Sequence, residues 1–102
     1  ADKAGNLYFC DMKAPSVVRI GTDGKRTEIC KESVSGLKFS PDESVLYGCQ
    51  GAKNRVIAIN PGNGEVKVVA EGVKPNDLAV TKDGFILITE TAAKQVTRID
   101  PK

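Results

Sequence analysis

The sequence contains no histidine and no tryptophan, and its 102 residues include one methionine, two tyrosines and three phenylalanines. Without histidine, the chain has no histidine general base or nucleophile, and most zinc and copper sites lose their usual ligand. Any metal ion would have to be held by carboxylates, amides and carbonyls. Such ligands favour hard cations of the calcium, magnesium or manganese kind.

Long hydrophobic runs and an excess of one charge are also missing. The apolar runs reach four or five residues, as at 66–70, where Lys67 interrupts the run, whereas a membrane helix needs about 18 residues. The 15 basic and 13 acidic residues nearly balance, the cations are scattered, and aromatic residues for base stacking are sparse. We therefore expect no membrane span and no nucleic-acid partner. We expect a soluble protein, either cytoplasmic or exported.

The three cysteines, at positions 10, 30 and 49, form no C-x-x-C pair. An odd count argues against a complete disulfide framework. Cys10 and Cys49 lie inside apolar strand patterns, which predicts buried thiols that act as small hydrophobic side chains.

Short β-type runs separated by turn formers make up the whole chain. The turn signals include Asp23-Gly24, Pro41-Asp42 and Asp83-Gly84, and no segment keeps a helical period. The pattern predicts strands at 6–10, 17–20, 27–30, 37–39, 45–49, 55–59, 66–70, 78–80, 85–89 and 95–99.

These runs repeat at an interval of about 40 residues. The stretch GLKFSPDESVLYGCQ at 36–50 aligns with DLAVTKDGFILITE at 77–90, so that Leu37 matches Leu78 at a step of 41. Ile20, Ile59 and Ile99 recur at steps of 39 and 40. A four-strand unit of this length is typical of a β-propeller blade. The sequence thus predicts an all-β fold of four-stranded antiparallel blades.

The repeat divides the chain into a truncated blade at 1–36, a complete repeat at 37–77 and a second truncated blade at 78–102. A closed propeller has four to eight blades, whereas ten strands make about two and a half. One chain is therefore expected to form an incomplete ring. Either it is a fragment of a longer propeller or copies of it assemble to complete one, because open strand edges and faces invite pairing.

Several stretches resemble the gluconolactonase, regucalcin and senescence-marker-protein family of six-bladed propellers. They are GNLYFCDM, GLKFSPDESVLYGCQG, RVIAINPGNGEV, AEGVKPNDLAVTKDG and RIDPK. The most specific piece is P-N-D-L followed by V-x-x-D-G. The resemblance covers essentially the whole chain, and it extends over about the first third of a family member.

The resemblance implies a metal-dependent sugar-lactone hydrolase with one divalent cation in the central channel. Calcium is the first expectation, with magnesium, manganese or zinc as alternatives. On this reading Asn76 is a metal ligand through its amide oxygen, and Asp77 and Ser35 belong to the substrate-binding wall. The family's ligand glutamate and its later ligand aspartate have no counterpart here. The isolated chain is therefore expected to be inactive.

Other readings stay open. Asn76-Asp77 could serve only as a turn at the start of a strand. The chain could also be a non-catalytic, self-assembling module or a propeller that binds a small molecule. Among the remaining polar positions, Gln50 and Glu90 match Asp11 in the repeat, and we expect them to lie at blade edges in solvent. We expect Tyr8 and Tyr47, which occupy matching positions, to pack between blades.

Overall fold

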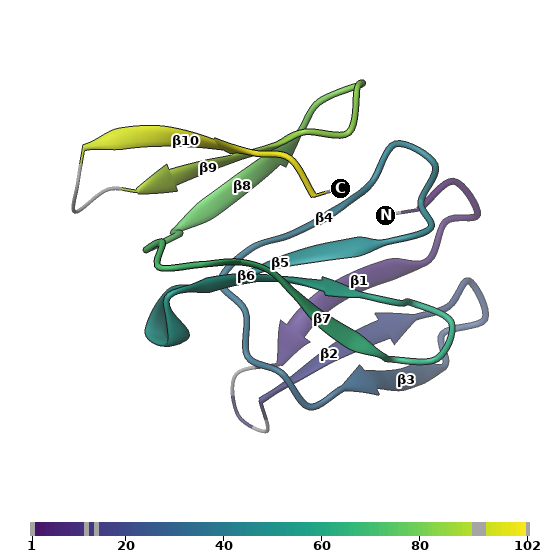
Figure 1. Cartoon of the computed structure of the whole chain (residues 1–102). Helices are drawn as coiled ribbons and strands as arrows, with labels where there is room; N and C mark the ends of the chain where they lie inside the picture. The colour runs from purple at the N-terminus through teal and green to yellow at the C-terminus, as the bar shows by residue number, and fades with distance from the viewer. Residues whose placement is uncertain (1, 12, 14, 91–93, 102) are drawn as a thin grey trace.

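The structure, a computed structural model, describes residues 2–11, 13, 15–90 and 94–101. These residues form ten strands in three antiparallel sheets, with one short 3-10 helix at Gly51–Lys53 (Figure 1). The first sheet contains β1 (Leu7–Asp11), β2 (Ser16–Ile20) and β3 (Arg26–Cys30). The middle sheet contains β4 (Leu37–Phe39), β5 (Leu46–Gln50), β6 (Arg55–Ile59) and β7 (Val66–Glu71). The last sheet contains β8 (Asp77–Val80), β9 (Ile86–Glu90) and β10 (Gln95–Ile99).

The predicted all-β class is confirmed, and all ten predicted strands are present. The prediction ended β1, β5 and β9 one residue early, before Asp11, Gln50 and Glu90. These three polar residues continue the ladders, opposite Ser16, Arg55 and Gln95 respectively. A polar side chain at a strand end was thus read as the start of a loop, although its backbone still pairs.

The three sheets share the same antiparallel arrangement of strands, but in the described part of the chain the outer two sheets each contain one strand fewer than the middle sheet. β1, β5 and β9 occupy the same place, as do β2, β6 and β10, and the paired residues match at steps of 39 or 40. Register shifts recur at matching points, between Val17 and Val18 and between Val56 and Ile57. The first sheet therefore lacks a counterpart of β4, and the last lacks a counterpart of β7, among the described residues.

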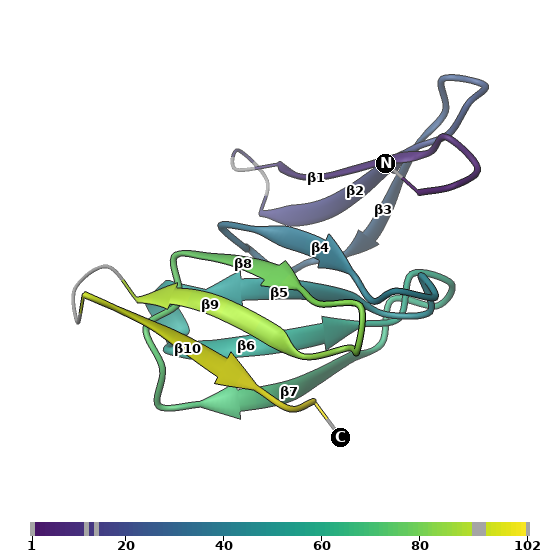
Figure 2. The same ribbon diagram turned by 90° about the horizontal axis from the view of Figure 1, so that it is seen from above.

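The middle sheet packs against another sheet on each face, and its central strands β5 and β6 are mostly buried. On one face, Leu46 and Ile57 cluster with Val17 of the first sheet. On the other face, Tyr47 clusters with Ile88 of the last sheet. The middle sheet lies between the other two (Figure 1), the last sheet overlaps it when seen from above (Figure 2), and β4 contacts β8. This double burial explains why every residue of β5 is buried.

Tyr8 and Tyr47 both lie between sheets, as the repeat predicted. Tyr8 packs against the middle sheet and makes an edge-to-face contact with Phe39, with ring centroids 4.9 Å apart. Tyr47 lies in the cluster that joins the middle and last sheets. Cys49 is fully buried, Cys10 is half-buried, and neither forms a disulfide.

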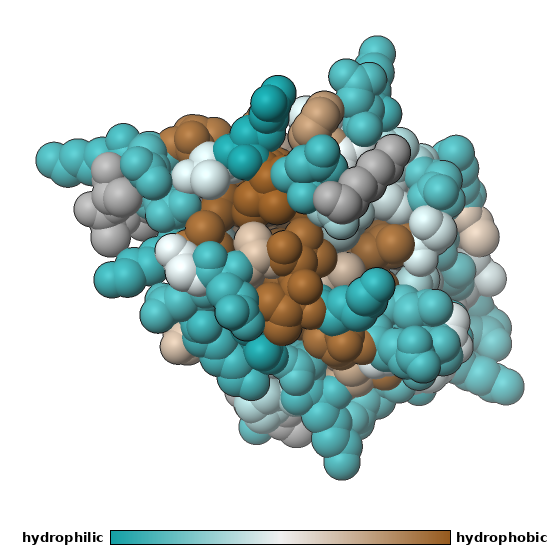
Figure 3. All heavy atoms as spheres, in the orientation of Figure 1, coloured by the Kyte–Doolittle hydropathy of each residue, from teal (hydrophilic) through white to brown (hydrophobic). Residues whose placement is uncertain are grey.

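Hydrophobic residues on the view of Figure 3 gather over the middle sheet, with hydrophilic residues around them. The outer sheets leave some apolar side chains uncovered, notably Leu7 at 53% exposure and Val96 at 64%. Among the described residues, no helix has the length and apolar character to cross a membrane.

The repeat offers a matched test of this packing. Leu46 and Leu7 occupy the same position in successive units, but Leu46 is 1% exposed and Leu7 is 53% exposed. We expect Leu46→Ala to lower the free energy of unfolding by about 3 kcal/mol, because it opens a cavity in the core. Leu7→Ala should cost less than about 1 kcal/mol. Urea denaturation followed by circular dichroism measures both, and equal losses would contradict the assigned packing.

Candidate functional site

The structure brings together the three residues that the sequence singled out, at the starts of β4 and β8. Ser35 and Asn76 lie 41 positions apart, at matching points of the repeat. The Ser35 hydroxyl donates a hydrogen bond of 2.7 Å to the backbone carbonyl of Asn76. We call this group, made of Ser35, Gly36, Asn76 and Asp77, the inner-strand site. It lies where β4 of the middle sheet contacts β8 of the last sheet.

The backbone of β9 fixes the position of this turn. The Asn76 N–H donates to the Thr89 carbonyl at 2.8 Å, and the Asp77 N–H donates to the Thr89 hydroxyl at 3.2 Å. Pro75, directly before, is buried. Two hydrogen bonds and a buried proline therefore hold Asn76 at the mouth of the strand.

Asp77 is pressed against the neighbouring sheet. Its Oδ1 accepts a hydrogen bond of 2.8 Å from the N–H of Leu78. A Cβ added to Gly36 would come within 2.5 Å of the same oxygen. A side chain at position 36 would displace this carboxylate, and the bond to Leu78 gives Asp77 a structural role of the kind that turn chemistry predicts.

The Asn76 side chain is exposed, and its amide has no hydrogen-bond partner among the described residues. Ser35 and Asp77 are exposed as well. Within the same residues, no three histidine, cysteine or acidic side chains come together in a group that could hold a metal ion. Oxygen donors are present at the inner-strand site, but they are few.

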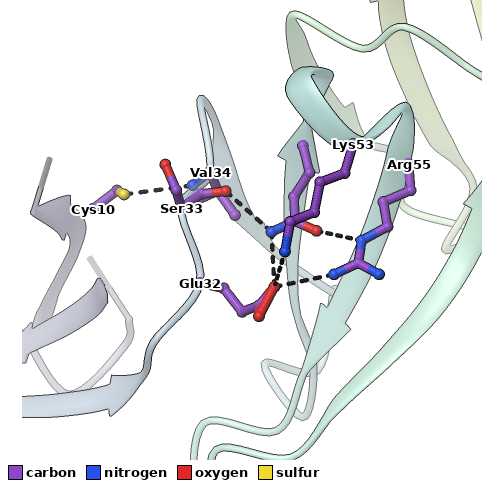
Figure 4. A network of polar contacts seen from close by, with 7 residues as sticks. Cys10, Glu32, Ser33, Val34, Lys53 and Arg55 are labelled. Carbon is purple, nitrogen blue, oxygen red and sulfur yellow. Dashed lines mark hydrogen bonds and ion pairs between the residues drawn. The ribbon is translucent and has the colours of Figure 1, made fainter. Parts of the chain in front are cut away.

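Beside this site, Glu32, Gln50, Lys53 and Arg55 form a polar network (Figure 4). Gln50 Nε2 donates to Glu32 Oε1 at 2.9 Å and to the Ser33 carbonyl at 3.1 Å. Arg55 donates from its Nε to Gln50 Oε1, and from a terminal nitrogen to Glu32 Oε1 at 3.1 Å. Lys53 Nζ lies 3.8 Å from the same carboxylate oxygen.

The expectation that Gln50 and Glu90 lie in solvent is wrong, because they are 3% and 7% exposed. Each side chain finds a partner that compensates for its burial: Gln50 has the partners just described, and Glu90 accepts a hydrogen bond of 2.7 Å from the Thr97 hydroxyl. Buried polar groups persist where such partners exist. A polar residue recurs at the end of β1, β5 and β9. This recurrence was the signal in the sequence that could have pointed to a shared structural role at this position.

A hollow of about 310 Å³ opens between the polar network and the inner-strand site. We call it the Lys53 hollow. Its lining includes Ser33, Ser35, Cys49, Gln50, Lys53 and Asn76. The lining includes Ser35 and Asn76, which the sequence analysis assigned to the site, and Gln50 and Lys53, which it did not.

Two ionisable groups beside the hollow are shifted by their surroundings. The hydrogen bond from Gln50, helped by the charges of Lys53 and Arg55, lowers the pKa of Glu32 below its ordinary value. Burial, with a smaller contribution from the Asp77 charge, raises the pKa of the Cys49 thiol to about 12. At neutral pH Glu32 is therefore ionised and Cys49 is an uncharged thiol.

No protein-family model matches this sequence, and no curated protein matches it. Solved structures do match. Virginiamycin B lyase from Staphylococcus aureus superposes on 98% of the chain with a TM-score of 0.81 and 23% identity. A chain of the nidogen–laminin complex covers 94% at a TM-score of 0.80 and 23% identity. A streptogramin B lyase covers 95% at a TM-score of 0.74 and 13% identity.

These neighbours are β-propellers, so the chain consists of β-propeller blades. The chain spans 36% to 39% of the length of each neighbour. At such identities the likeness concerns the fold alone. It supports the propeller part of the resemblance noted above and says nothing specific about gluconolactonases.

The Glu32 network predicts a pH dependence of stability. Because the folded pKa of Glu32 lies below that of the unfolded chain, its ionised form stabilises the fold at neutral pH. This contribution is lost as the pH falls through the folded pKa. We expect Glu32→Gln to be less stable than the parent chain at pH 7 and to approach it at pH 3. Urea titrations at both values measure this, and a difference that stays constant would contradict the role of the charge.

Proposed function

We propose that this chain supplies part of the axial site of a β-propeller that binds a divalent cation and a small hydroxylated ligand. The activity proposed for the complete propeller is metal-dependent hydrolysis of a sugar lactone. The observation that carries the proposal is the 2.7 Å hydrogen bond between Ser35 and Asn76. This bond links matching points of two successive repeat units, which supports a site shared among blades.

The donors at this place suit a hard cation in kind. Asn76 offers an amide oxygen and Asp77 a carboxylate, both exposed, and calcium prefers six to eight such oxygens. The described residues supply only a subset, so other blades would provide the rest. When bound, the cation would polarise a lactone carbonyl as a Lewis acid. Asn76 would hold the ion, while Ser35 and Asp77 would orient the ligand beside it.

The similar structures are compatible with more than one use of the fold. Two of them are lyases, so propellers of this kind carry enzyme chemistry elsewhere. The third belongs to a complex between two proteins. The choice of a hydrolase therefore rests on the sequence resemblance and on the inner-strand site.

The cation assignment predicts that Asn76→Ala weakens calcium binding by about tenfold, since one oxygen ligand is lost. Isothermal titration calorimetry on whatever assembly the chain forms measures the affinity. Asn63→Ala is the matched control, because Asn63 caps a turn by accepting a hydrogen bond of 2.9 Å from the Glu65 N–H. Unchanged affinity in Asn76→Ala would remove Asn76 as a ligand.

Assembly into a larger ring is a second candidate function, and the repeat favours it. Leu7 matches Leu46, which is 1% exposed, and Val96 matches Val56, which is fully buried. The counterparts of Leu7 and Val96 are thus covered by a neighbouring sheet, whereas these two side chains are open. We propose that a second copy covers them, with the first sheet of one copy against the last sheet of the other.

Light scattering at several concentrations tests the assembly. We expect a discrete oligomer, and we expect Leu7→Lys or Val96→Lys to shift it toward monomer, because a charge in an apolar interface is costly. Val68→Lys on β7, at a side chain already 42% exposed, is the control. A monomer at all concentrations would rule out self-assembly and leave another blade of a longer chain as the covering element.

A further inference from the structure

We propose that the Lys53 hollow binds a small hydroxylated acid, with the carboxylate on the Lys53 ammonium group and the hydroxyls toward Ser35 and Asn76. The inference deepens the proposed function and rests on it for the ligand's hydroxyls, because the hollow shares Ser35 and Asn76 with the inner-strand site. The carboxylate subsite itself needs no metal ion.

The charges around the hollow are the first argument. The polar network contains two cations, Lys53 and Arg55, but one carboxylate, Glu32. Arg55 is the better-placed partner, since it bonds both Glu32 and Gln50. Lys53 Nζ lies farther from Glu32 Oε1, at 3.8 Å, and the Lys53 side chain is 58% exposed. Its ammonium group therefore has capacity for a further anion, and nitrogen–carboxylate hydrogen bonds are among the stronger ones available.

The hydrogen-bonding capacity of the uncharged lining residues is the second argument. Cys49 and Val34 make an uncharged floor, because the Cys49 thiol stays protonated at neutral pH. The Ser35 oxygen, which donates to Asn76, can still accept a hydrogen bond. The Asn76 amide can both donate and accept. These groups suit alcohol hydroxyls better than a second ionic group.

The charges on the two sides of the hollow favour one orientation of the ligand. Asp77 directly follows the lining residue Asn76, and Lys53 lines the opposite part of the site beside Gln50. Because like charges repel and opposite charges attract, a ligand carboxylate is favoured at Lys53 over the Asn76 side.

The volume limits the size of the ligand. About 310 Å³ lies at the lower end of the range for small-molecule sites. One sugar-sized molecule fits this space. D-gluconate and glucitol are suitable probes, because they share a hydroxylated six-carbon chain and differ in the carboxylate.

The experiment is a calorimetric titration of the chain with gluconate and with glucitol, in buffer freed of divalent cations over a chelating resin. We expect gluconate to bind about tenfold more tightly than glucitol. Lys53→Gln should remove this preference, and Lys53→Arg, which keeps the charge, should retain most of it. Lys67→Gln on the exposed part of β7 is the control, and circular dichroism verifies the fold of each variant.

Equal affinity for the two probes, no binding of either, or an unchanged preference in Lys53→Gln would overturn the inference. The results separate it from the proposed function. A preference for gluconate without calcium binding at Asn76 would contradict the proposed cation site and support the carboxylate subsite at Lys53. Calcium binding that depends on Asn76, together with no preference for gluconate, would do the reverse.

Discussion

Burial of β5 and β6, the central strands of the middle sheet, between the two outer sheets is the constraint on which the other features depend. Leu46 and Ile57 are covered by the first sheet, and Tyr47 and Cys49 by the last. A shift of β5 by one residue would exchange its two faces and disrupt both clusters at once. The register of the middle sheet is therefore strongly fixed, and so are the points at which β4 and β5 end.

The same packing holds the segment that carries the polar network. Val34 is 4% exposed and lies over Gly48, where an added Cβ would come within 2.7 Å of its side chain. The Val34 N–H also donates to the Cys10 sulfur of the first sheet at 3.4 Å. Glu32 and Ser35 flank this anchor. The hydrophobic contact between the sheets thus sets the position of the groups that face the Lys53 hollow.

The polar side chains around the Lys53 hollow fall into two groups, one with hydrogen-bond partners in the protein and one that stays exposed. Gln50, Arg55 and Glu32 bond one another, which lowers the cost of removing Gln50 from water. Asn76, Ser35 and Lys53 keep exposed atoms beside the hollow. A satisfied network next to a few open groups is an arrangement suited to binding, since the backbone at Asn76 is held by hydrogen bonds before a ligand arrives.

The sequence by itself determined the all-β class, the ten strands and the 40-residue repeat, because alternation and turn residues are local signals. The resemblance to the gluconolactonase family also singled out Ser35, Asn76 and Asp77 as candidate site residues. Only the tertiary structure decided that Ser35 bonds Asn76 and that Gln50 is buried. Those outcomes depend on which sheets meet and on partners such as Glu32, 18 positions from Gln50. Strand periodicity carries no such information, because it fixes the face of a side chain and not its neighbour across a sheet.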